Sequence, residues 1–132
     1  MSAADDDDRS PYEFIGEAGV RGLAERFYDH MDAHEPALAA LHELENGRGA
    51  PKVRERFFWF LSGWLGGPQM YMERIGHPRL RMRHARVAID QEMRDAWMHC
   101  MSAALNAIDM PPAVRDFLRT RFDEVATFLI NR

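Results

Sequence analysis

Apolar residues recur every three or four positions over most of the chain, a spacing that places them on one face of a helix. In the segment 17–34 charged residues lie opposite this stripe, and a short helical turn is expected at 36–42. The segment 51–65 begins with a proline suited to a first helical turn and is apolar on more than one side. The two long stripes comprise Val20, Leu23, Ala24, Phe27, Tyr28 and Met31, and then Val53, Phe57, Phe58, Trp59, Phe60, Leu61, Trp64 and Leu65.

Two more helices are predicted in the last third of the chain. Asp90 can cap the first, and "MPP" at 110–112 ends it and starts the second. "ENGRG" at 45–49 predicts a turn. No segment shows convincing strand alternation except "RLRMR" at 79–83, which is short and rich in arginine. The sequence therefore predicts an all-α fold with four main helices and an irregular middle at 66–89. The inner faces of the last two helices are Met93, Trp97, Met101, Ala104, Leu105 and Ile108, and then Val114, Leu118, Phe122, Val125 and Leu129.

The composition is that of a globular chain. Its 132 residues are 46% hydrophobic, which suits a single domain at 12–132, and the acidic run "DDDD" predicts a flexible tail at 1–11. The net charge of −4 argues against a nucleic-acid partner. A single cysteine, no signal-peptide pattern and no apolar run of about 18 residues favour a cytoplasmic protein without a membrane span.

Positive charge is concentrated in the run "GHPRLRMRH" at 76–84, although the chain as a whole is acidic. One interpretation is a solvated loop that forms an anion or nucleic-acid site. A haem accounts for this run and for the broad apolar face at 51–65 together. Its macrocycle needs apolar walls, its propionates need arginine or lysine, and its iron needs a neutral imidazole.

Four motifs resemble those of the group II truncated haemoglobins. They are "RFYDHM" at 26–31, "FLSGWLGGPQMY" at 60–71, "GHPRLRMRH" at 76–84 and "RDAWMHCM" at 94–101, and the resemblance extends from about residue 12 to residue 130. It implies a truncated globin fold, a two-on-two helical sandwich around haem b.

The resemblance also implies which residues hold the haem. His84 is expected to be the proximal iron ligand, with its other ring nitrogen donating to a backbone carbonyl. Arg56, Tyr71 and Arg83 are expected near the propionates. The remaining expected haem contacts are Phe60, Leu80, Ile89 and Met101.

On the distal side, the position where ordinary globins keep a histidine falls on Val53, which cannot donate a hydrogen bond. The resemblance implies that Tyr28 and Trp97 are the donors instead, and that Phe57 forms an apolar wall beside the ligand. His42 lies at a position that varies in the family. We expect it at the pocket edge, donating to the ligand or to Tyr28 and not binding the iron. A pKa near 6.5 would make ligand kinetics depend on pH between about 5 and 8.

These expectations favour a protein that reversibly binds dioxygen, carbon monoxide or nitric oxide, with no catalytic residue. A redox enzyme acting on peroxide or nitric oxide is a second hypothesis, and because the sequence shows no flavin or nicotinamide domain, it would need a separate reductase. A third is a helical module without haem that binds an anionic partner through residues 79–86.

Overall fold

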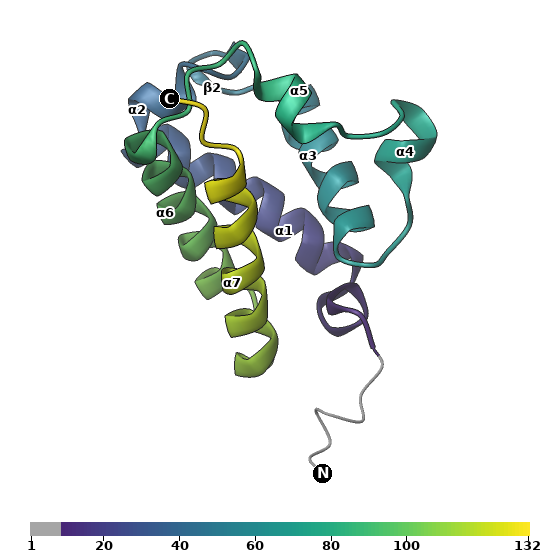
Figure 1. Cartoon of the computed structure of the whole chain (residues 1–132). Coiled ribbons are helices and arrows are strands. Elements are labelled where there is room, and N and C mark those ends of the chain that lie inside the picture. Colours follow the sequence, from purple (N-terminus) through teal and green to yellow (C-terminus); the bar gives the residue numbers. More distant parts are fainter. Residues whose placement is uncertain (1–8) are drawn as a thin grey trace.

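The computed structural model describes residues 9–132, and its elements are mostly helical, as the hydrophobic pattern predicts (Figure 1). The expected acidic run at 5–8 lies outside the described residues. The long helices are α1 (Pro11–His34), α3 (Pro51–Trp64), α6 (Gln91–Ala107) and α7 (Pro112–Phe128). The short elements are α2 (Pro36–Ala39), β1 (Leu44–Glu45), β2 (Arg48–Gly49), α4 (Met70–Arg74) and α5 (Leu80–His84).

The helix ends follow local signals in the sequence. The Ser10 side chain caps α1 by accepting from the backbone of Glu13, so α1 begins before the domain boundary expected at residue 12. Gly16, with φ +70°, kinks α1 in its second turn. Asp90 caps α6 as predicted, accepting from the Met93 amide at 2.8 Å.

The Gly66–Gly67 pair ends α3 and allows the chain to turn closely over the start of α1. Gly66 has φ +96°, a conformation that favours glycine. A Cβ added at Gly67 would lie 2.3 Å from the Tyr12 ring, so no larger residue fits there without movement. The Tyr12 amide donates to the Leu65 carbonyl at 3.0 Å. The break at 66–68 therefore also joins α3 to the start of α1.

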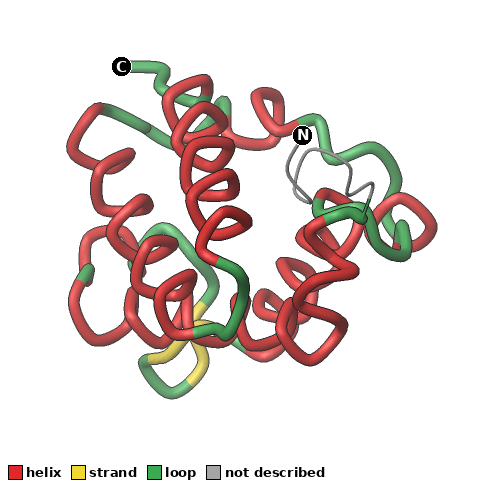
Figure 2. Tube along the Cα trace, turned by 90° about the horizontal axis from the view of Figure 1, so that it is seen from below, coloured by secondary structure: helices red, strands yellow, loops and turns green. Residues whose placement is uncertain are grey.

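The turn predicted at 45–49 is present, but it forms a small antiparallel hairpin that the sequence did not indicate. Asn46 and Gly47 have φ values of +55° and +76°, as in the two-residue turns that join paired strands. Each strand is two residues long, and Figure 2 shows the hairpin at the edge of the helical body. The irregular middle likewise contains two short helices, α4 and α5.

The long helices form two packed pairs. Helix α1 packs against α3, α6 packs against α7, and α1 also crosses α6. Ridge-and-groove packing of this kind buries the predicted stripes. No helix in the described part of the chain combines the length and the hydrophobicity that crossing a membrane requires. The largest fully buried side chains include Leu23, Phe27, Met31, Phe58, Leu61, Leu65, Met101, Leu105, Leu118 and Phe122.

One buried guanidinium joins α1, β2 and α3. Arg54 is 6% exposed, and its Nε donates to the Gly49 carbonyl at 2.9 Å. Its terminal nitrogens lie 2.8 Å from carboxylate oxygens of Glu25, Asp29 and Asp32. Asp32 in turn accepts from the Gly49 amide at 3.1 Å. This ion cluster fixes the hairpin and α3 against one face of α1.

We predict that Arg54→Met destabilises the protein by about 3 kcal/mol, because the nearly buried Asp32 carboxylate loses its cation. Arg48 also pairs with Asp29 but is exposed, so the matched variant Arg48→Met should cost less than about 1 kcal/mol. Urea unfolding followed by circular dichroism measures both. Equal losses for the two variants would contradict the importance of the buried cluster.

Candidate functional site

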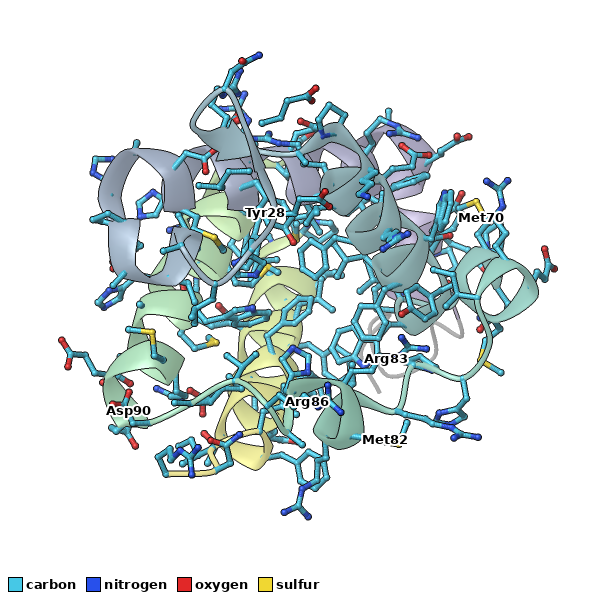
Figure 3. The ribbon with its side chains drawn as sticks, turned by 90° about the horizontal axis from the view of Figure 1, so that it is seen from above. Tyr28, Met70, Met82, Arg83, Arg86 and Asp90 are labelled. Atoms are coloured by element: carbon cyan, nitrogen blue, oxygen red, sulfur yellow. The ribbon has the colours of Figure 1, made fainter. Side chains whose placement is uncertain are left out.

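A cavity of about 410 Å³ lies between the helices and is lined mainly by apolar side chains. Tyr28 from α1 and Arg83 from α5 approach it from opposite sides (Figure 3). The structure thus gathers residues that are far apart in the sequence around one space. The predicted site residues that line it are Tyr28, His42, Val53, Arg56, Phe57, Phe60, Tyr71, Leu80, Arg83, His84, Ile89 and Trp97.

His84 is the last residue of α5 and is partly buried. Its Nδ1 lies 2.6 Å from the Leu80 carbonyl oxygen, which is the hydrogen bond that the resemblance implied. Because a carbonyl only accepts, Nδ1 carries the proton. In the tautomer with the proton on Nδ1, Nε2 carries no proton, and this is the nitrogen with which an imidazole can bind a metal.

Two arginines provide positive charge where the cavity meets solvent. Arg83 donates through Nε to the Pro78 carbonyl at 2.6 Å, and its guanidinium carbon lies 5.7 Å from the centre of the Tyr71 ring. Figure 3 shows Arg83 on the cavity side of α5 and Met82 on the outer side. Within residues 10–132, neither Arg56 nor Arg83 forms an ion pair with a carboxylate. Both cations are therefore free to bind an anionic group at this edge.

A cluster of aromatic rings forms the inner end of the cavity. Phe27 is 1% exposed and lies at its centre. The centre of its ring is 5.2 Å from that of Tyr28, 4.8 Å from Phe57 and 5.2 Å from Trp97. Edge-to-face and tilted contacts at such distances are favourable. The buried Phe27 thus supports three side chains that were predicted to surround a ligand.

Tyr28 and Trp97 each bring a hydrogen-bond donor to this cavity. In the described part of the chain, neither the Tyr28 hydroxyl nor Trp97 Nε1 has a hydrogen-bond partner. Burial raises the pKa of the Tyr28 hydroxyl far above its ordinary value, and the Arg54 guanidinium offsets this only in part. Tyr28 therefore keeps its proton at neutral pH and can donate to a ligand.

His42 lies just beyond α2 and lines the cavity. Its Nδ1 is 3.0 Å from the Leu38 carbonyl oxygen, and its ring packs edge-on against Tyr28 with centres 5.6 Å apart. Burial lowers the pKa of His42, and the neighbouring His84 adds to this effect. The pKa of His42 therefore lies below its ordinary value, so the pH dependence expected of this group moves toward lower pH.

Comparison with known families identifies the fold. A model described as bacterial-like globin matches residues 10–131. The chain belongs to the bacterial-like globin family. Membership of this family implies a haem cofactor.

Named relatives agree with the family model. This globin is 35% identical to group 2 truncated hemoglobin YjbI of Bacillus subtilis (strain 168), over 93% of the chain and 89% of that protein. It superposes with a TM-score of 0.87 on the cold-adapted truncated hemoglobin of Pseudoalteromonas haloplanktis TAC125, at 42% identity, covering 94% and 99% of the two chains. The group II 2-on-2 hemoglobin of Agrobacterium tumefaciens gives 0.85 at 31% identity, covering 99% and 98%. The resemblance to group II truncated haemoglobins and the two-on-two fold are confirmed.

The residues around the cavity have the chemistry that a haem requires. The walls are apolar, as a macrocycle needs, and His84 has one ring nitrogen left for iron. The guanidiniums of Arg56 and Arg83 can pair with the two propionates. The hypothesis of a helical module without haem is therefore not favoured in this globin.

One predicted haem contact, Met101, does not line the cavity. It lies one turn beyond Trp97 on α6 and is fully buried in the core, so the inner face of α6 turns from cavity to core between these residues. Twelve lining residues were not predicted as site residues, although half of them belong to the predicted inner faces of helices. Those outside the prediction are Phe27, Leu38, Leu41, Trp64, Pro78, Val87, Met93, Arg94, Phe122, Val125, Ala126 and Leu129.

We predict that His42 makes the protein less stable in acid. Because burial lowers its folded-state pKa, the unfolded chain binds the proton more readily, and stability falls as the pH drops below about 6.5. His42→Phe removes this group and should reduce the loss of stability between about pH 7 and pH 5. Urea midpoints at the two pH values test this, and parallel profiles for the two proteins would contradict it.

Proposed function

We propose that this globin reversibly binds dioxygen and other diatomic ligands on a haem b iron held by His84. One observation carries the proposal. A single cavity brings together an imidazole with an available Nε2 and two donors, Tyr28 and Trp97, that have no hydrogen-bond partner among residues 9–132. Haem iron supplies the coordination position at which a diatomic ligand binds and becomes negatively polarised.

On the proximal side, His84 would bind the iron through Nε2. The Leu80 carbonyl fixes the tautomer and the direction of the ring, because it accepts the Nδ1 proton at 2.6 Å. A hydrogen-bonded Nδ1 also makes the other nitrogen a better electron donor. Leu80 and Ile89 add apolar contacts to the same wall.

On the distal side, donors and apolar walls would share the work. Trp97 is a donor only, so it favours a negatively polarised ligand and cannot accept from one. The protonated Tyr28 can donate as well, and His42, whose ring meets that of Tyr28, can assist either group. Val53 and Phe57 exclude water without competing for the ligand.

At the open edge, Arg56, Arg83 and Tyr71 would hold the propionates. Arg83 is already oriented by the Pro78 carbonyl and the Tyr71 ring, so little side-chain freedom is lost when it pairs. We also infer a reducing cytoplasm as the site of action. The single cysteine of this globin, Cys100, is fully buried, and burial raises the pKa of its thiol to about 12. These properties suit a packing residue.

The first test of this proposal is the visible spectrum. The protein should purify red, and His84→Ala should lose the axial bond and retain haem less well. The exposed His34 provides the matched control His34→Ala, which should keep the parent spectrum. An unaltered Soret band and ferrous carbon monoxide spectrum in His84→Ala would show that another residue holds the iron.

The second test concerns ligand escape. A hydrogen bond to a charged acceptor contributes about 1.5–3 kcal/mol, so Trp97→Phe should speed dioxygen dissociation by roughly ten- to a hundredfold. Trp59→Phe removes the same N–H group away from the cavity, where it donates to Glu55, and is the control. Stopped-flow rates for Trp97→Phe within about twofold of the parent would refute its role as a donor.

A further inference from the structure

Helix α5, which carries His84, has few interactions of its own that stabilise it. It is five residues long, contains no buried residue and has no side-chain cap at its start. Its first flanking residue, Arg79, has φ +46°, a conformation uncommon outside glycine and asparagine. Helices this short are not stable alone in water. The position of His84 therefore depends on contacts from elsewhere in the chain.

The end of the chain, which follows α7, lies beside the segment between α5 and α6 (Figure 1), and Asn131 supplies hydrogen bonds to that segment. Its Nδ2 donates to the His84 carbonyl at 3.2 Å and to the Val87 carbonyl at 2.9 Å. Its Oδ1 accepts from the Ile89 amide at 2.8 Å. Its backbone amide donates to the Ile89 carbonyl, also at 2.8 Å.

This arrangement uses each polar group of one carboxamide. Two carbonyls face Nδ2 and one amide faces Oδ1, so only one orientation of the Asn131 side chain satisfies all three partners. Within residues 10–132, Asn131 and Arg132 supply the only hydrogen bonds that tie residues 77–89 to a distant part of the chain. All the other hydrogen bonds of this segment are local.

We infer that Asn131 is a positioning residue for the proximal histidine. The ring of His84 is held by the Leu80 carbonyl, and the main chain of His84 is held by Asn131. With both fixed, the direction of Nε2 is fixed as well. This inference rests on the proposed role of His84 as the iron ligand, and it assigns the end of the chain a role in setting the iron–histidine bond.

Asn131→Asp tests the inference with almost no change in shape. The carboxylate still offers an acceptor but loses both donors, and the carbonyl oxygens of His84 and Val87 repel its negative charge. The side chain is therefore expected to move away from this segment, which weakens its hydrogen bond to the Ile89 amide as well. Asn106→Asp is the matched control, with the same change in charge. The Asn106 side-chain oxygen accepts from Arg119 at 2.8 Å, a contact that a carboxylate retains.

Three measurements are made on each variant. Hydrogen exchange of the Ile89 amide in the haem-free protein reports whether the hydrogen bond between Ile89 and the residue 131 side chain is broken. Resonance Raman spectra of the ferrous protein report the iron–histidine stretching band. Transfer of haem to apomyoglobin reports retention. In Asn131→Asp we expect faster exchange, a shifted or broadened band and haem loss about tenfold faster, with Asn106→Asp like the parent.

The outcomes separate the inference from the proposed function. Faster Ile89 exchange with an unchanged Raman band and unchanged haem transfer would show that Asn131 only stabilises the folded chain and does not position His84. This outcome would overturn the inference. Unchanged Ile89 exchange would show that the Asn131 side chain does not hold this segment, and this too would overturn the inference. A parent protein without a Soret band would instead refute the proposed function itself.

Discussion

The cavity of about 410 Å³ is the constraint on which the rest of this structure depends, because the helices pack around a space that their own side chains do not fill. Most of the fully buried side chains lie outside this cavity, among them Leu23, Leu61 and Leu105, where α1 meets α3 and α6. Phe27 and Phe122 are fully buried and also line the cavity. A large apolar cavity lowers stability, and a molecule that binds only the folded chain restores it. Folding and cofactor binding are therefore linked, and the Arg54 cluster stabilises α1 and α3 independently of the cavity's contents.

Much of this architecture could be predicted from the sequence because it follows local rules. The apolar stripes located the four long helices, and Asp90, Pro51 and the glycines at 66–67 marked helix ends that the structure contains. Periodicity identifies the inner face of a helix, but it does not say what that face meets. Met101 and Phe122 were both placed inward, yet Met101 contacts the core and Phe122 also borders the cavity.

The features that escaped prediction depend on contacts between distant residues. Nothing in the residues around Arg54 or Asn131 indicates that one joins three elements and the other holds the α5–α6 segment. The basic run was only partly explained. Arg83 lines the cavity, whereas Arg79, Arg81 and Arg86 do not, and Arg81 lies with its guanidinium carbon 5.0 Å from the centre of the exposed Phe128 ring.

The aromatic cluster around Phe27 has a consequence for how this globin can evolve. Tyr28, Phe57 and Trp97 all rest on the same ring, so a substitution at one alters the support of the other two. Energies of residues that share a contact do not add. A change of donor that is harmful in the present background can therefore be neutral after a change at Phe57. The order in which substitutions arise therefore affects which combinations of side chains can be selected around this cavity, because their effects are coupled through contacts with Phe27.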